Sequence, residues 1–220
     1  MTVPTPQVVT VETAAGPGRW HVTRPSGVAR GQLLLGHGAG GGVNATDLVA
    51  LAMRLPASGV LVCRFEQPWR VAGRKVAGPP ASLDRAWCEA APSILDPSLP
   101  LVVGGRSAGA RVACRTAPLM KAAAVLLIAF PLHPPGRPER SRADELPDGP
   151  LLAVQGERDA FGGPDELRPH LGQAQELIAI PDADHSLKVR RAGPTSQEDA
   201  DDLLVRTCSR WLGTLLETPG

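Results

Sequence analysis

Residues 101–111 read LVVGGRSAGAR, and the interpretation of the whole chain depends on this stretch. An apolar run rich in β-formers stops at two glycines, a serine follows, and an Ala-rich helical pattern begins at once. Residues 105–109 fit the pattern G-x-S-x-G, in which a tight strand-to-helix turn exposes a serine hydroxyl above a sheet. The glycines are needed because a side chain at either position would collide with neighbouring backbone. Ser107 is therefore a candidate nucleophile, and the competing interpretation is an ordinary turn in which Ser107 caps the helix.

Length, charge and cysteine usage restrict the class of protein. The chain has 220 residues and a net charge of +1, which gives no electrostatic reason to expect nucleic acid or an anionic membrane as partner. The longest apolar run, residues 122–130, is too short to cross a bilayer, and residues 1–6 show no secretory signal. The four cysteines lack metal-site spacing and are expected to be buried thiols in a reducing cytosol: Cys63, Cys88, Cys114 and Cys208. We therefore expect a cytoplasmic protein, monomeric or homodimeric, that acts on a small molecule without a metal or cofactor.

Apolar segments alternate with helical patterns along most of the chain. Two short strands, 7–13 and 20–23, flank a Gly-Pro-Gly turn at 16–18 and predict a hairpin. Further apolar runs are each followed by a helical pattern, which predicts a mostly parallel twisted sheet with helices on both faces. These runs are residues 33–35, 59–65, 101–103, 123–128, 151–155 and 177–180. Helices are expected over 46–55, capped by Asn44 or Thr46, over 82–91 and 165–171, and from a capping box at Ser196 and Asp199.

The pattern fits a single α/β domain over residues 1–220, with the N-terminal antiparallel hairpin at 7–23 and a catalytic core at 31–216. The connection 131–150 is polar and rich in proline, and it contains no amphipathic helix. We therefore expect no large lid, an open site, and small soluble substrates.

Three candidate catalytic groups follow three different strands, in the order Ser107, Asp159, His185. In a parallel sheet the carboxyl ends of the strands share one edge, so these side chains are expected to meet there. A serine hydroxyl attacks only when an imidazole takes its proton, and a carboxylate on the other ring nitrogen holds that imidazole in the required tautomer. Glu157 is the alternative acid; Asp182 and Asp184 lie close to His185 in sequence, where they rarely face the ring.

A glycine-rich loop follows the apolar run 33–35 and reads GHGAGGG over residues 36–42. As an oxyanion loop it would supply the Ala39 backbone N–H, with Gly40 as the alternative, beside the N–H of Ala108 after the nucleophile. The same residues satisfy G-x-G-x-x-G, and Glu66 ends the next strand, so a dinucleotide-binding oxidoreductase is a second hypothesis. That hypothesis leaves the three strand-end groups unexplained.

Other residues near these strand ends are candidates for binding substrate. His37 and Gly38 belong to the glycine loop, and Phe161 follows the candidate acid. Arg70 and Arg106 would favour a carboxylate- or phosphate-bearing substrate, although ordinary backbone bonds or solvent are competing roles for both. His133 follows a strand end and either lines the cleft or is packed by its neighbouring prolines.

Several segments resemble the KANL/Tex family of α/β-hydrolase-like proteins, a branch near the dienelactone hydrolases. They are residues 33–41, 64–70, 104–111, 131–139, 155–159 and 184–185. The resemblance implies the α/β-hydrolase fold and the roles of nucleophile, acid and base for Ser107, Asp159 and His185. It supplies no substrate, and some relatives serve as non-catalytic subunits, so a binding or scaffold protein is the alternative. The expected function is a serine hydrolase that acts on small esters, thioesters or lactones through an acyl-enzyme.

Overall fold

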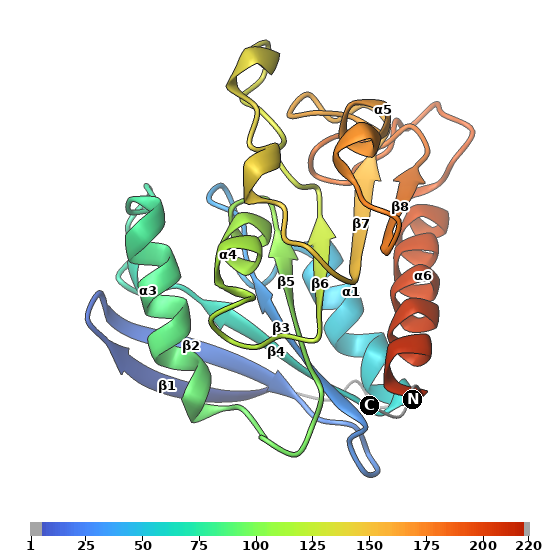
Figure 1. Cartoon of the computed structure of the whole chain (residues 1–220). Helices are drawn as coiled ribbons and strands as arrows, with labels where there is room; N and C mark the ends of the chain where they lie inside the picture. Colours follow the sequence, from blue (N-terminus) through green and yellow to red (C-terminus); the bar gives the residue numbers. More distant parts are fainter. Residues whose placement is uncertain (1–5, 218–220) are drawn as a thin grey trace.

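The computed structural model describes residues 6–217 and contains one eight-stranded sheet (Figure 1). The strand order is β1-β2-β4-β3-β5-β6-β7-β8; β1 and β2 are antiparallel to their neighbours, and all other pairs are parallel. The bounds are β1 Gln7–Thr13, β2 Gly16–Thr23, β3 Gly31–Gly36, β4 Val60–Glu66, β5 Leu101–Arg106, β6 Ala124–Ile128, β7 Leu151–Gly156 and β8 Gln175–Ile180. The predicted fold class, a mostly parallel sheet with an N-terminal antiparallel hairpin, is confirmed.

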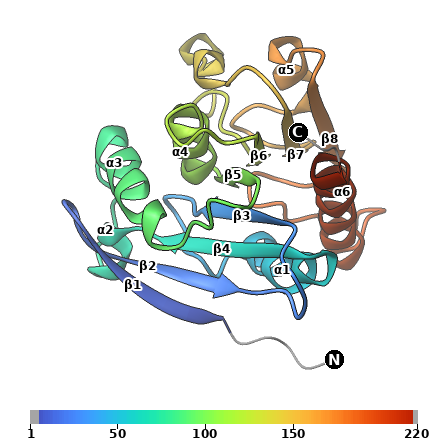
Figure 2. The ribbon, with the colours of Figure 1, turned by 60° about the horizontal axis from the view of Figure 1, so that its bottom comes forward.

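Helices cover both faces of the sheet (Figure 2). One face packs against α3 (Pro80–Ala90) and α4 (Ala108–Thr116), and the other against α1 (Thr46–Arg54) and α6 (Gln197–Glu217). Two short helices, α2 (Pro68–Val71) and α5 (Pro164–Leu167), follow β4 and β7. Short 3₁₀ turns complete the elements at Leu55–Ser58, Ala91–Ser93, Pro138–Arg140, Ala143–Glu145 and Arg168–His170. The connection 131–150 therefore holds two 3₁₀ turns and no α-helix, in agreement with the expectation that it forms no large lid.

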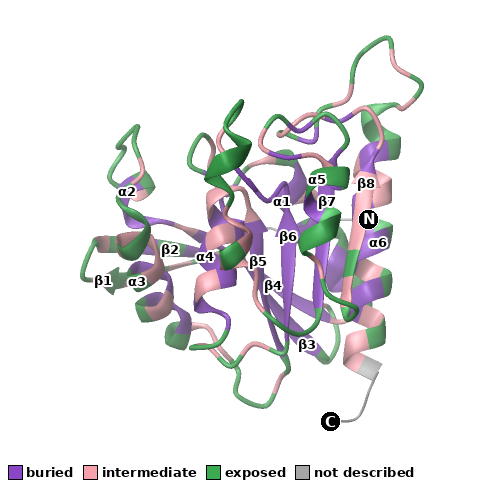
Figure 3. Ribbon diagram, turned by 45° about the horizontal axis from the view of Figure 1, so that its top comes forward, coloured by how far each residue is buried: buried purple, intermediate pink, exposed green. Residues whose placement is uncertain are grey.

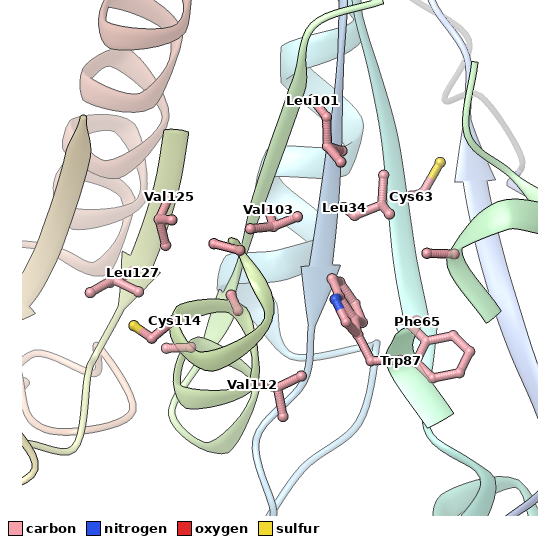
Figure 4. Packing of buried hydrophobic residues seen from close by; sticks show 14 of the residues in the cluster. Leu34, Cys63, Phe65, Trp87, Leu101, Val103, Val112, Cys114, Val125 and Leu127 are labelled. Atoms are coloured by element: carbon pink, nitrogen blue, oxygen red, sulfur yellow. The ribbon is translucent and has the colours of Figure 1, made fainter. Parts of the chain in front are cut away.

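The central strands β3 to β7 are buried on both faces, which explains why their sequences are almost continuously apolar (Figure 3). Successive side chains of a strand point to opposite faces. In β3, Leu34 packs with the cluster under α3 and α4, whereas Leu33 and Leu35 pack with the cluster under α1 and α6. The first cluster contains Trp87 of α3 and Phe65 of β4, with ring centroids 5.9 Å apart (Figure 4).

Three local expectations were wrong. The hairpin turns at Ala14 and Ala15, so residues 16–18 belong to β2, and the Thr13 hydroxyl donates to the Gly16 carbonyl across the turn at 2.7 Å. Neither Asn44 nor Thr46 caps α1: its N-cap is Ala45, whose side chain forms no capping bond. Cys88 is only half-buried, while the other three cysteines are buried free thiols.

The last helix is confirmed with its cap. The Ser196 hydroxyl accepts the Asp199 backbone N–H at 3.0 Å and donates to the Asp199 carboxylate at 2.7 Å. The apolar stripe of α6 then packs on the sheet through residues such as Leu204, Cys208 and Trp211. Over residues 6–217, no helix combines the length and the apolar character needed to cross a bilayer.

Candidate active site

Ser107 lies in the turn between β5 and α4, with φ 53° and ψ −113°. A non-glycine residue in this region is strained, and the surrounding contacts hold it there. The Ser107 backbone N–H donates to the Ile128 carbonyl at 3.0 Å. A side chain on Gly109 would lie 2.3 Å from the Gly36 carbonyl, so only glycine lets α4 approach β3 this closely. The predicted strand-turn-helix geometry of the serine is therefore present, with the hydroxyl at the carboxyl edge of the sheet.

The three side chains expected at the strand ends do meet. His185 Nε2 lies 3.0 Å from Ser107 Oγ, and His185 Nδ1 lies 2.8 Å and 3.0 Å from the two Asp159 oxygens. Gly156 permits this approach, because a side chain there would lie 2.5 Å from the Ala183 carbonyl in the loop that carries His185. Ser107, Asp159 and His185 thus form one chain of hydrogen bonds, although Ser107 and His185 are 78 residues apart in the sequence.

The alternative acids are engaged elsewhere. The Glu157 carboxylate accepts the Asp182 backbone N–H at 2.9 Å. Asp182 forms ion pairs with Arg158 and Arg190, and Asp184 accepts backbone N–H groups of its own loop. Asp159 is the carboxylate that contacts the His185 imidazole.

Asp159 is held in a dry, polar setting. Its side chain is fully buried, and it accepts hydrogen bonds from the Gln155 amide at 2.9 Å and the Phe161 backbone N–H at 2.8 Å. The Phe161 ring stacks on the His185 ring, with centroids 4.1 Å apart and planes 29° from parallel. An ionised carboxylate only accepts, so His185 Nδ1 carries the proton and Nε2 is free to accept from the Ser107 hydroxyl.

The glycine loop is fixed by His37. Its Nε2 accepts the Gln67 backbone N–H at 3.1 Å, so Nδ1 carries the proton and donates to the Gly38 carbonyl at 2.9 Å. Burial lowers the pKa of His37, which favours this neutral form. His37 thus joins the ends of β3 and β4, and it stabilises the loop from which the first oxyanion donor is expected.

Two adjoining pockets lie beside this loop. The inner pocket is lined by Gly36, His37, Ala39, Gln67, Trp69, Ala77, Leu83, Ala108, Gly109 and Val112. The outer pocket is lined by Ala15, Gln67, Pro68, Trp69, Arg74, Val76, Gly78, Ser82 and Leu83. The inner pocket brings together Ala39 and Ala108, the two residues expected to supply oxyanion N–H groups.

The remaining candidate binding residues differ in what they contact. Gly38 lies against the serine, since a side chain on it would come within 3.3 Å of Ser107 Cβ. The Arg106 guanidinium pairs with Asp47 at 2.7 Å and donates to the His185 carbonyl at 3.0 Å. These bonds direct it into the protein, towards the loop that carries the imidazole.

His133 and Arg70 also have defined surroundings. His133 Nε2 lies 3.0 Å from the Glu166 carboxylate, and its backbone N–H donates to the Phe161 carbonyl. Its ring therefore braces the loop after Asp159. Arg70 is exposed on α2, with its guanidinium carbon 6.0 Å from the centre of the Trp69 ring.

Three functional residues were missed from sequence: Gln155, Asp47 and Gln67. A signal existed for Gln155, because it is a polar residue inside an otherwise apolar strand, and its buried amide bonds Asp159, the Phe130 carbonyl and the Gly162 carbonyl. Asp47 is 2% exposed at the start of α1, and nothing in its spacing pointed to Arg106. Gln67 follows β4 directly, and its backbone N–H donates to His37 Nε2.

The dinucleotide hypothesis receives little support from this geometry. In that fold, a helix begins at the glycine loop and directs its N-terminus at the pyrophosphate. Here α1 begins at Thr46, beyond the glycine loop. The Glu66 carboxylate, expected to bind ribose, lies 3.4 Å from His21 Nε2 and 3.8 Å from the Arg19 guanidinium.

Known proteins share this architecture. Residues 29–213 match the family described as the alpha/beta hydrolase domain. An α/β serine hydrolase without a lid from Xanthomonas campestris is 22% identical, with a TM-score of 0.71 over 96% of each chain. A dienelactone hydrolase from Anabaena variabilis is 19% identical, with a TM-score of 0.71 over 96% of this chain and 98% of that one. An α/β serine hydrolase homologue from Coxiella burnetii is 20% identical, with a TM-score of 0.69 over 94% and 99%.

No curated protein matches the sequence significantly. The structural similarities establish the fold, and the family match covers the segment that carries the serine turn, the glycine loop and the loops of Asp159 and His185. The resemblance to the α/β-hydrolase superfamily is thereby confirmed, and the chain belongs to the alpha/beta hydrolase domain family.

Proposed function

We propose that this protein is a serine hydrolase that cleaves small esters, thioesters or lactones through a covalent acyl-enzyme. The observation that carries the proposal is the continuous relay from Ser107 through His185 to buried Asp159, with contacts of 3.0 Å and 2.8 Å. A neutral imidazole in this position can take the hydroxyl proton as the oxygen attacks a carbonyl carbon.

The reaction proceeds in two halves. Ser107 Oγ attacks the acyl carbon while His185 Nε2 takes its proton, and the carbonyl oxygen becomes an oxyanion. Collapse of this intermediate expels the alcohol or thiol, which receives the proton from His185. A water then gives a proton to His185 and attacks the acyl-enzyme, and breaking of the Ser107 ester releases the acid and restores the hydroxyl.

The Ala39 and Ala108 N–H groups are the proposed oxyanion donors. Both residues line the inner pocket, next to the turn that holds Ser107. Donors of this kind contribute roughly 3–4 kcal/mol each in the transition state, because they are already oriented before charge develops. His37 contributes indirectly by holding the loop that carries Ala39.

The surroundings support small substrates. No α-helix covers the site from the connection 131–150, and the inner pocket is walled by Trp69, Leu83 and Val112. Arg70 stands exposed on α2 with its guanidinium next to the Trp69 ring. We assign Arg70 the role of attracting substrates that carry a carboxylate or phosphate.

The experiment is hydrolysis of p-nitrophenyl acetate by the wild-type protein and by Ser107→Ala. The substitution removes one oxygen, so the protein should fold normally while kcat falls by roughly 10⁴- to 10⁶-fold. Ser186→Ala, an exposed serine next to His185, is the matched control and should keep the wild-type rate. An unchanged rate in Ser107→Ala would remove the assignment.

A further inference from the structure

We propose that Phe161 promotes catalysis through His185: the face of its ring stabilises the imidazolium that His185 becomes each time it takes a proton. Phe161 is then a positioning residue that acts on the base, whereas from the sequence it is a candidate for binding substrate. This inference rests on the proposed hydrolase function and assigns a role to a further side chain of the same site.

The Phe161 ring lies against the ring of His185. The two ring centroids are 4.1 Å apart, and the planes are 29° from parallel. The imidazole is therefore over the negative face of the phenyl ring, well within the roughly 6 Å at which such a face attracts a cation. A neutral imidazole gains only packing from this contact, whereas a charged imidazole also gains electrostatic attraction. The contact thus favours the charged form.

The Phe161 backbone is fixed by two hydrogen bonds. Its N–H donates to the Asp159 carboxylate at 2.8 Å, and its carbonyl accepts the His133 backbone N–H at 3.0 Å. The Asp159 oxygen that accepts this N–H also lies 3.0 Å from His185 Nδ1. One buried carboxylate therefore sets the positions of both rings, and the phenyl ring stays against the imidazole.

The charged groups around His185 act on its ring edge or on its backbone. Asp159 contacts Nδ1 at the edge, and the Arg106 guanidinium donates to the His185 backbone carbonyl at 3.0 Å. Asp184, in the same loop, accepts backbone N–H groups of that loop. These three contacts do not involve the face of the ring. A substitution of Phe161 therefore changes the face and leaves these charges in place.

His185 gains charge in both halves of the proposed reaction. It takes a proton from Ser107 in the first half and from water in the second, so both transition states contain a developing imidazolium. An interaction that is stronger in the transition state than in the ground state raises the rate. The attraction of the Phe161 face for this charge meets that condition, and contacts of this kind give about 3- to 10-fold.

The test measures kcat/KM for p-nitrophenyl acetate from about pH 5 to pH 9 in wild type, Phe161→Leu and Phe161→Tyr. Leucine keeps apolar cover over the imidazole and removes the aromatic face, whereas tyrosine keeps the face. We expect Phe161→Leu to lose about 3- to 10-fold at the alkaline plateau. Its acidic limb should move to lower pH by about 0.5 to 1 unit, because a base that is harder to charge is protonated only in more acidic solution.

The two effects have one cause, and this separates them from a loss of position. On the acidic side of the limb, Phe161→Leu keeps more of its base unprotonated, so its deficit should shrink towards zero there. Displacement of His185 alone would lower the rate equally at every pH. Phe161→Tyr should keep the wild-type limb and stay within about twofold of the wild-type rate.

The matched control is Phe65→Leu. Phe65 is buried in the cluster under α3 and α4, with its ring centroid 4.6 Å from that of Trp20 and 5.9 Å from that of Trp87. The substitution removes an aromatic ring from the core without changing the face of His185. It should lower the melting temperature and leave the pH profile of kcat/KM unchanged.

Three results would overturn the inference and leave the hydrolase assignment standing. The first is an acidic limb that does not move in Phe161→Leu. The second is a limb that moves to higher pH, which would mean that the ring acts by excluding water from the imidazole. The third is a Phe161→Tyr profile that matches that of Phe161→Leu.

An NMR titration of the His185 ring proton separates this inference from the proposed function, since it reads protonation without turnover. The titration midpoint should be lower in Phe161→Leu than in wild type by the same 0.5 to 1 unit, approximately. Equal midpoints would overturn the inference. If no ester is hydrolysed in a Ser107-dependent manner, the proposed function fails and the catalytic role of Phe161 fails with it. The titration alone then decides whether the ring stabilises the charged imidazole.

Discussion

The amino ends of the parallel strands form one edge of the sheet, the amino edge, and their carboxyl ends form the other, the carboxyl edge. The two edges belong to the same apolar strands, but they differ in their polar groups and in their backbone strain. Of the five non-glycine residues with positive φ among the described residues, four follow carboxyl ends of strands, namely Ser107, Ala129, Asp182 and Leu187. Lys121, the fifth, precedes the amino end of β6. Strain of this kind persists only where the surrounding contacts hold it, and it concentrates at functional sites.

Two buried glutamines show the same contrast. At the amino edge, Gln32 bonds the segment after α3 with both ends of its amide and is fully satisfied. At the carboxyl edge, Gln67 keeps a buried carbonyl without a partner among the described residues. The Gln32 amide thus ties down the amino edge, whereas the proposed relay of Ser107, His185 and Asp159 lies at the carboxyl edge. Four changes test this contrast.

Of these four changes, Asp159→Asn is expected to have the largest effect on activity. The asparagine amide fits the same space but can donate to His185 Nδ1, which favours the tautomer that cannot accept from Ser107. We expect kcat for p-nitrophenyl acetate to fall about 10⁴-fold with the melting temperature nearly unchanged. Asp165→Asn, at an exposed position of α5, is the control and should retain full activity. A loss below tenfold in Asp159→Asn would assign the imidazole to a different acid.

A smaller effect is expected from the two arginines that flank the serine turn. Arg106 pairs with buried Asp47 and bonds the His185 carbonyl, whereas Arg111 pairs with Glu145 in the connection 131–150. Lysine cannot make both bonds of Arg106, because it lacks the forked guanidinium. We expect Arg106→Lys to lower kcat about 10- to 100-fold with little change in KM, through misplacement of His185.

Arg111→Lys is the matched variant and should change the melting temperature without changing kcat. Equal kcat losses in the two variants would show that both arginines act only through stability.

At the amino edge, Gln32→Met should affect stability and leave catalysis intact. The substitution removes bonds to the Asp96 and Leu99 carbonyls and to the Asp96 N–H. Leaving such groups unpaired costs about 1–3 kcal/mol in the free energy of unfolding. Urea unfolding measures this loss, and kcat/KM per folded molecule should stay at the wild-type value. A tenfold fall in that value would mean that the two edges are not separate in function.

The smallest effect concerns the pH dependence of stability. Burial lowers the pKa of His37, so below about pH 6.5 the unfolded chain binds a proton that the folded chain does not. The contribution of His37 to the free energy of unfolding therefore decreases as pH falls, by at most about 1.4 kcal/mol per pH unit. The backbone bond to Pro134 raises the pKa of His133, which acts in the opposite direction.

Comparing the pH dependence of the free energy of unfolding between wild type and His37→Gln isolates the contribution of His37. Urea unfolding at pH 7.5, 6.5 and 5.5 should show a shallower fall in stability for the variant. Parallel pH curves would indicate that the pKa of His37 is the same in the folded and unfolded states.

Much of the fold and the location of the site followed from sequence. Strands buried on both faces are continuously apolar, and the strand-end rule placed Ser107, Asp159 and His185 at one edge, where the structure brings them into contact. Element ends were less predictable. The hairpin turn lies at Ala14 and Ala15, before the Gly-Pro-Gly segment, and the Thr13 hydroxyl donates to the Gly16 carbonyl across it.

The groups that support the site were missed for a different reason. Gln155 and Asp47 act through partners 4 and 59 residues away, and the second separation has no local pattern. The direction of Arg106 depends on a buried carboxylate that only the packed fold places beside it. Such roles require the three-dimensional arrangement, because burial and partner together decide what a polar side chain does.

The most direct test of the central claim is covalent labelling by a fluorophosphonate probe, read by intact mass and peptide mapping. We expect one adduct per wild-type molecule, on Ser107, and no adduct on Ser107→Ala. Asp159→Asn should react far more slowly than the wild type. A folded wild-type protein that stays unlabelled, or labelling that persists in Ser107→Ala, would contradict the account and favour a binding or scaffold role for the chain.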